Sequence, residues 1–229
     1  MKTISIHQPV YLPWLGFFKK IMSSEIFVFL DDVQFEKNGW QNRNKIRTHE
    51  GDIWLTVPVN SKSNILLKDI TIDNSLNWTK KHSQSICLNY SKAKFFDRYW
   101  NDFERIYEKR FECLIDLNLE IIKLLMKKFN IKTKTILSSE LEISEHGAKR
   151  ILKICKVLGA DSYLSGIVGK EYLRIDDFNE NNINVDFQNF QHPTYNQAYK
   201  PFHPNMAAID LLYNEGTESK KILKKAENF

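Results

Sequence analysis

The segment from residue 3 to residue 34 limits the possible folds more than any other part of the chain. Residues 3–7 alternate β-branched and polar side chains, which is typical of a short strand. Two prolines within residues 8–13 end that strand, because proline fixes φ and cannot donate to a sheet. Residues 14–23 have the apolar spacing of a helix, and residues 25–30 form the apolar run of a buried parallel strand. The segment therefore predicts a βαβ unit.

In a βαβ unit, the loops after the two strands meet at the carboxyl edge of the sheet, where ligands bind. Six polar residues are expected at this edge: His7, Gln8 and Tyr11 in the first loop, and Asp31, Asp32 and Gln34 in the second. A loop histidine beside a carboxylate is typical of general-base catalysis near neutral pH. The alternative for His7 is a structural hydrogen bond to the loop backbone. Consecutive aspartates in a strand face opposite ways, so at most one of them should face the crevice.

The charge of the chain favours an ordinary solvated surface over a nucleic-acid-binding face. The formal net charge is +5, and the lysines are scattered over predicted helices and the C-terminal tail. Among them are Lys19 and Lys20, which the helical spacing turns away from the core. Small anions such as nucleotides remain compatible with this charge. A hydrophobic content of 42% over 229 residues predicts a substantial core, and we expect a single α/β domain over residues 1–229.

The cysteines and the N-terminus predict a cytoplasmic protein. Cys87, Cys113 and Cys155 are odd in number and far apart, which favours buried, reduced thiols over a disulfide framework or a zinc site. The N-terminus has no signal-peptide pattern, and no apolar run is long enough to cross a bilayer. No spacing typical of metal ligands joins the histidines and carboxylates, so no metal site is predicted.

Residues 41–47 are unusually polar for a segment between two predicted strands. One interpretation is a solvated hairpin. The other is an anion-binding loop, in which Arg43 is a planar donor for phosphate or carboxylate, with Asn44 and the point charge of Lys45 beside it. The run that follows at residues 66–72 also has the pattern of a strand.

The middle of the chain predicts helices, after which the α/β rhythm returns. Residues 78–129 have helical spacing with an aromatic stripe, which is more typical of a core than of a binding site. A predicted strand then leads into a loop with Ser165 and Gly166, whose backbone amides could face an anion, and Tyr172 lies close by. The pattern as a whole predicts an α/β fold, a Rossmann-like parallel sheet with a mid-chain helical insertion.

The last part of the chain adds one strand and one helix. Residues 185–190 alternate like a strand and are followed by His192 and Tyr195, two further candidates for substrate binding. For His192 a structural role is the stronger expectation. Residues 204–213 have the pattern of a final helix, and the lysine-rich residues 220–229 are expected to be frayed or solvated.

Several stretches together resemble the WbqC-like protein family. They are IHQPVYLPWLGFFKKI, DDVQF, NRNKI and WLTVPV in the first quarter of the chain, followed by LGADSYLSG, FQHPTY and the segment from Pro204 to Gly216. The blocks occur in order along nearly the whole chain, and the first is the most specific. Because this family is found among bacterial O-antigen and capsule genes, the resemblance implies modification of nucleotide-linked sugars for surface polysaccharide.

The opening of the chain also resembles pantothenate-synthetase-like nucleotidyltransferases, which hold a triphosphate with an H-x-G-H motif. The corresponding stretch here runs from Trp14 to Phe17 and keeps the glycine but neither histidine. The missing histidines argue against adenylyl transfer by that mechanism. They favour a site that has kept the fold of these enzymes but serves a different reaction.

These observations lead to one functional hypothesis and two alternatives. The hypothesis is an enzyme of O-antigen or capsular polysaccharide biosynthesis that transfers an acyl or aminoacyl group to the amine of a nucleotide-linked amino sugar. The alternatives are a non-catalytic sugar-nucleotide-binding partner subunit and a degenerate nucleotidyltransferase. No motif in the sequence identifies a cofactor. The sequence is compatible with a homodimer or with a complex with a partner enzyme. The expected roles are general base for His7, orientation for Asp31 or Asp32, anion binding for Arg43 and Lys45, and stacking on the substrate for Tyr11 and Trp14.

Overall fold

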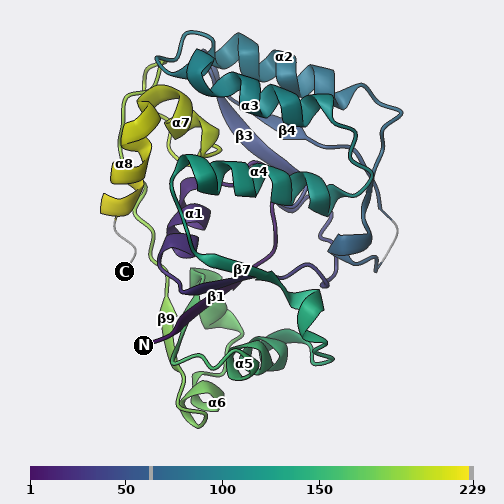
Figure 1. Cartoon of the computed structure of the whole chain (residues 1–229), viewed down its shortest axis with the longest axis vertical. Helices are drawn as coiled ribbons and strands as arrows, with labels where there is room; N and C mark the ends of the chain where they lie inside the picture. The colour runs from purple at the N-terminus through teal and green to yellow at the C-terminus, as the bar shows by residue number, and fades with distance from the viewer. Residues whose placement is uncertain (62–63, 227–229) are drawn as a thin grey trace.

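A five-stranded parallel sheet forms the centre of the molecule in a computed structural model that describes residues 1–61 and 64–226 (Figure 1). In spatial order its strands are β7 (Lys134–Leu137), β2 (Ile26–Phe29), β1 (Thr3–His7), β8 (Ser162–Ser165) and β9 (Asn184–Phe187). Every pairing is parallel, and the register places Ile4 beside Ile26 and Tyr163. The predicted Rossmann-like α/β fold is thereby confirmed.

Helices cover both faces of the sheet, and the alternation of the strands decides which residues meet them. Ile4 and Ile6 of β1 face the cluster that contains Ile151 and Ile154 of α5 (Gly147–Val157). Phe27 and Phe29 of β2 face the other, larger cluster, which includes α1 (Leu15–Met22) and α4 (Leu114–Lys128). Figure 1 shows α5 and the short α6 (Ile175–Asn179) on one side of the sheet, with α1 and α4 on the other.

The segment between β2 and β7 holds the predicted helical insertion and a two-stranded hairpin. The helices are α2 (Trp78–Tyr90), α3 (Phe96–Glu108) and α4, and their aromatic stripe packs into the larger core as expected. The hairpin consists of β3 (Arg43–Thr48) and β4 (Gly51–Thr56), joined by a turn at residues 49–50. A second short pair comprises β5 (Val59–Asn60) and β6 (Thr71–Ile72).

Two predictions along the chain were wrong. Residues 66–72 do not form one strand, because a 3-10 turn, η1 (Leu67–Asp69), breaks the run and leaves only the two residues of β6. The tail is not frayed over its described length, since α8 (Ser219–Lys225) buries Leu223 completely in the larger core. The remaining elements are η2 (Ser138–Leu141), η3 (Ile167–Glu171), α7 (Ile209–Glu215) and η4 (Gly216–Glu218).

Candidate functional site

A pocket of about 570 Å³ opens at the carboxyl ends of β1 and β8. The chain leaves β1 toward α1 on one face of the sheet and enters η3 after β8, so the two connections diverge at this point. Such a divergence is where open α/β sheets bind ligands. The lining side chains are Ile6, His7, Gln8, Trp14, Phe17, Lys20, Leu30, Ile151, Tyr163, Val168, Tyr172, Gln188, Asn189, Phe190 and Asn205, together with the loop at residues 166–169.

His7 presents one unprotonated ring nitrogen to this pocket. Its Nδ1 lies 2.8 Å from the carbonyl oxygen of Gln8, and because a carbonyl only accepts, Nδ1 carries the proton and Nε2 keeps its lone pair. Burial, assisted by the nearby charge of Lys20, lowers the pKa of His7 to about 4. The ring makes edge contacts with Trp14 and Phe17. His7 is therefore neutral at physiological pH, and Nε2 is a fixed proton acceptor.

Lys20 also lines the pocket, which corrects the expectation that it points away from the core. Its side chain is only 2% exposed, and Nζ donates a hydrogen bond of 3.0 Å to the carbonyl oxygen of Ile6 on β1. Burial lowers the pKa of Lys20 to about 7, since the charged form loses its hydration. A lysine with this pKa is available both as a cation and as a free amine near neutral pH.

Two glycines shape the walls of the pocket. A Cβ at Gly16 would lie 3.0 Å from the ring of Phe190, so glycine lets the loop after β9 close against the start of α1. At the same contact, Gln188 Nε2 donates a hydrogen bond of 2.9 Å to the carbonyl oxygen of Gly16. A Cβ at Gly169 would lie 2.0 Å from Ser165 Oγ, so glycine is required where η3 folds over the end of β8. Ser165 is buried beneath this turn, whereas Gly166 and Tyr172 line the pocket.

The pocket lining contains two basic side chains and, among the residues that the structure describes, no carboxylate. The predicted site residues His7, Gln8, Trp14, Gly166 and Tyr172 meet here. A cation would find no counter-charge in this lining, whereas an anion would find Lys20. The electrostatic character of the site thus favours an anionic ligand.

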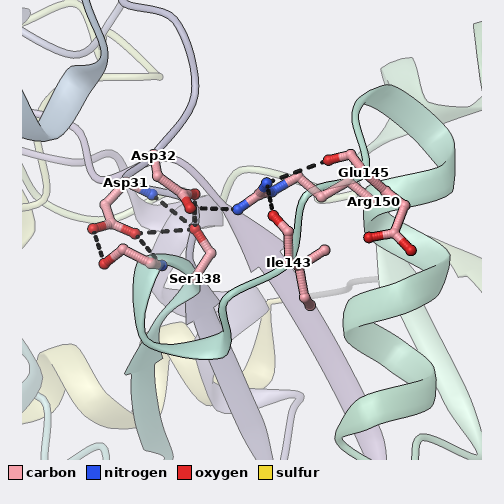
Figure 2. Close-up of polar contacts among 7 residues, drawn as sticks. Asp31, Asp32, Ser138, Ile143, Glu145 and Arg150 are labelled. Carbon is pink, nitrogen blue, oxygen red and sulfur yellow. Dashed lines mark hydrogen bonds and ion pairs between the residues drawn. The ribbon is translucent and has the colours of Figure 1, made fainter.

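Asp31 and Asp32 do not join His7; both turn toward the start of η2 (Figure 2). Ser139 donates to Asp31 from its backbone N at 2.9 Å and from its hydroxyl at 2.6 Å, and Ser138 Oγ donates to Asp31 at 3.0 Å. Asp32 accepts from Ser138 Oγ and forms an ion pair with Arg150 of α5. The expectation that the two carboxylates face opposite ways was therefore wrong, because the strand ends at Phe29 and its alternation does not reach them.

Two other predicted ligand contacts are buried elsewhere. Tyr11 is fully buried, and its hydroxyl lies 2.8 Å from His82 Nδ1 and 2.7 Å from the hydroxyl of Tyr107, so this ring has no surface for stacking on a ligand. Asn44 is 1% exposed, and its side chain donates to the carbonyl oxygen of Leu12. Both residues hold the proline-containing loop in place behind the pocket.

The polar segment at residues 41–47 belongs to a hairpin, as one of the two interpretations predicts, but several of its polar side chains are buried and not solvated. Gln41, Asn42, Asn44 and Arg47 are buried, and Arg47 donates to backbone carbonyls of its own hairpin and of Pro201.

The outer side chains of β3 lie apart from the pocket lining. Lys45 pairs with Asp52 at 3.1 Å, and the guanidinium of Arg43 lies 4.6 Å from the ring centroid of Trp54. Gln34 is exposed and donates to Asn64.

His192 and Tyr195 lie behind the pocket wall. His192 Nδ1 is 2.9 Å from the carbonyl oxygen of Pro193, and its ring contacts that of Phe190. The Tyr195 hydroxyl donates a hydrogen bond of 2.7 Å to the buried carboxylate of Asp210. Desolvation raises the pKa of Asp210. These contacts fix the loop that supplies Phe190.

Comparison with known proteins agrees with the resemblance seen in the sequence. The model of the WbqC-like protein family matches residues 8–222. The chain belongs to this family. It is also 31% identical over 228 residues to the "Uncharacterized protein Rv1507c" of Mycobacterium tuberculosis (strain ATCC 25618 / H37Rv), an alignment that covers 98% of each chain. No solved structure matches the chain significantly.

The described residues contain neither a candidate membrane-spanning helix nor a cluster of metal-ligating side chains. None of their helices combines the length and apolar character needed to span a membrane. They also contain no group of three histidine, cysteine or acidic side chains placed to hold a metal ion.

Sequence reasoning missed several lining residues of this WbqC-like protein. The helical spacing predicts that Lys20 points away from the core, although in the structure it lines the pocket from the same helix as Phe17 and Ile21. Gln188, Asn189 and Phe190 follow β9, the neighbour of β8, and Asn205 lies in the same long loop. Ligands bind near the carboxyl ends of parallel strands. This rule identifies Gln188, Asn189 and Phe190 once β9 is known to lie beside β8.

Proposed function

We propose that this protein is a transferase of O-antigen or capsular polysaccharide biosynthesis that acylates the amine of a nucleotide-linked amino sugar. The supporting observation is the pocket that combines His7 Nε2 and Lys20 in a lining without carboxylates. Membership of the WbqC-like family supports the polysaccharide context implied by the sequence resemblance.

The charge of the pocket suits this substrate in two ways. A nucleotide sugar is an anion because of its diphosphate, and the positive charge of Lys20 attracts an anion toward the pocket. The amine must be uncharged to attack an acyl group, and a lining with a lysine and no carboxylate disfavours the ammonium form. The site therefore binds the sugar in its nucleophilic state.

In the proposed reaction the amine nitrogen attacks the carbonyl carbon of an acyl thioester. A C–N bond forms, the C–S bond breaks, and the electron pair of that bond leaves with the sulfur. His7 Nε2 takes the proton that the amine loses and passes it to the departing thiolate. Its Nδ1–H bond to Gln8 holds the ring in the required tautomer. Gln8, Gln188 and Asn205 line the pocket, and in this proposal their side chains contact the sugar hydroxyls.

The test begins with a thermal-shift screen of nucleoside triphosphates, coenzyme A thioesters and UDP-, dTDP- and GDP-linked amino sugars. A ligand at a hundred times its Kd stabilises the folded state by about 2.7 kcal/mol. Acyl transfer to the stabilising sugar is then measured for the wild type, His7→Gln and His146→Gln. The His7→Gln variant should lose about a hundredfold in kcat/KM or more. The exposed His146 at the start of α5 serves as the matched control and should retain wild-type activity.

A non-catalytic sugar-nucleotide-binding subunit is the second candidate, because a histidine with a pKa of about 4 is a weak base in the free protein. Binding of one sugar nucleotide without turnover of any donor, and with His7→Gln binding as tightly as the wild type, would favour this candidate. Stabilisation by nucleoside triphosphates alone, with release of pyrophosphate, would instead favour nucleotidyl transfer.

A further inference from the structure

Two tryptophans lie exposed and in contact on the hairpin side of the molecule. Trp40 is 46% exposed and Trp54 is 42% exposed, with ring centroids 5.2 Å apart. Large apolar side chains that gather on a surface mark interaction sites, whereas single exposed residues do not. This pair is therefore a candidate binding surface outside the pocket.

Trp14 connects this pair to the pocket. Its ring centroid lies 5.6 Å from that of His7 and 6.2 Å from that of Trp40. The backbone supports the connection, since Tyr11 N donates to the carbonyl oxygen of Trp40 at 3.3 Å. Trp14, Trp40 and Trp54 thus form an aromatic track that runs from the pocket lining to the outer face of the hairpin.

The guanidinium of Arg43 lies against the outer end of the aromatic track, at Trp54. Arg43 lies 4.6 Å from the ring centroid of Trp54, and Lys45 lies 5.3 Å from it. Lys45 is neutralised by Asp52 at 3.1 Å. Arg43 donates to the carbonyl oxygen of Asn38 and has no carboxylate partner in the described part of the chain, so its charge is not neutralised. Arginine held against an aromatic ring is preorganised for binding phosphate oxygens.

We propose that the aromatic track and Arg43 bind the nucleoside diphosphate part of the substrate. The base stacks on the exposed surfaces of Trp40 and Trp54, and the phosphates bind Arg43 beside Trp54. Only the statement that this nucleotide carries a sugar rests on the function proposed above.

Charge selects a nucleoside diphosphate over a plain saccharide as the occupant. Either ring stacks on an indole, but a neutral saccharide leaves the guanidinium of Arg43 without a counter-charge. The diphosphate supplies that charge beside the base.

The experiment measures Kd by calorimetry for UDP, dTDP, GDP and ADP, with inorganic pyrophosphate and a free amino sugar as comparison ligands. The variants are Trp54→Ala and Arg43→Gln. Leu88→Ala and Arg98→Gln are matched controls, since Leu88 is exposed on α2 and Arg98 stacks on Tyr99 of α3. Melting curves verify that each variant is folded, which is expected because the indole of Trp54 is largely exposed.

At least one nucleoside diphosphate should bind to the wild type. Trp54→Ala and Arg43→Gln should each raise its Kd tenfold or more, equivalent to about 1.4 kcal/mol. The two controls should bind as the wild type does. This pattern without any acyl transfer would leave the nucleotide subsite standing while the proposed transferase failed. Binding of the saccharide alone, or equal Kd values in Trp54→Ala and the wild type, would overturn the subsite.

Discussion

Arg150 of α5 and Asp32, which follows β2, form an ion pair in which the two side chains are only 6% and 15% exposed. The same guanidinium donates to the carbonyl oxygens of Ile143 at 2.7 Å and Glu145 at 3.3 Å (Figure 2). Asp32 therefore joins the end of a central strand to the segment that leads into α5. The Asp32 carboxylate therefore stabilises the fold, whereas the sequence alone predicts a catalytic role at this position.

Replacing Asp32 should therefore affect stability more than turnover. The Asp32→Asn variant leaves the Arg150 charge buried without its partner, and breaking such a pair costs about 3–5 kcal/mol. Urea denaturation measures the loss. The Asp32→Asn/Arg150→Met double variant should be less destabilised than the two single changes added together. A normal unfolding midpoint combined with lost activity would instead return Asp32 to the catalytic site.

The C-terminal helix α8 should contribute to stability despite its lysine-rich sequence. Leu223 is fully buried in the larger core, so Leu223→Ala should lower the free energy of unfolding by about 2–5 kcal/mol. The control Lys221→Ala changes an exposed residue of the same helix and should fall within about 0.5 kcal/mol of the wild type. Equal unfolding midpoints for the two variants would mean that the tail is detached in solution.

The sequence predicts the sheet well because its strands carry local signals. The buried run of β2 and the two prolines after β1 determine where these elements begin and end, whatever the rest of the chain does. The α8 helix was missed because its charge pattern hides one deeply buried leucine, Leu223. Local composition does not reveal which single residue a distant core will cover.

The site was harder to predict because its members meet only through the strand order. The sequence suggests that the loops after β1 and β2 share a crevice, but the pocket opens where β1 meets β8. Asp31 was misassigned for this reason, since its oxygens satisfy the turn at residues 138–139. Lys20 was missed because a charge on a helix is normally solvated, and only the fold shows that it lies beneath the end of β1.

His82 should make the protein sensitive to mild acid. Burial lowers its pKa to about 4, so between pH 6.5 and pH 4 the unfolded state binds more protons than the folded state. The free energy of unfolding therefore falls with pH in this window, by up to about 1.4 kcal/mol per pH unit for this group. Denaturation of the wild type and His82→Gln at pH 7, 6 and 5 measures the difference. The variant should lose less stability, and parallel pH profiles would contradict the buried, neutral state.

Lys20 should also make the free energy of unfolding rise with pH, in a window that begins near neutral pH and extends to alkaline pH. Burial lowers its pKa from 10.5 to about 7, so between these values the unfolded state again holds the extra proton. The cost of burying the charge is fully present below pH 7 and is relieved as the pH rises toward 10.5. The wild type should therefore gain stability relative to Lys20→Met across pH 7–9, by up to about 1.4 kcal/mol per pH unit.

Denaturation of both proteins at pH 6, 7, 8 and 9 measures this difference, since the other titrating groups are shared. Lys153→Met is the matched control, because Lys153 is exposed on α5. This control should follow the wild type at every pH. A constant gap between the wild type and Lys20→Met would show that the amine keeps its ordinary pKa in the pocket. Binding of an anionic ligand should flatten the profile of the wild type, because a neighbouring negative charge raises the pKa of Lys20 again.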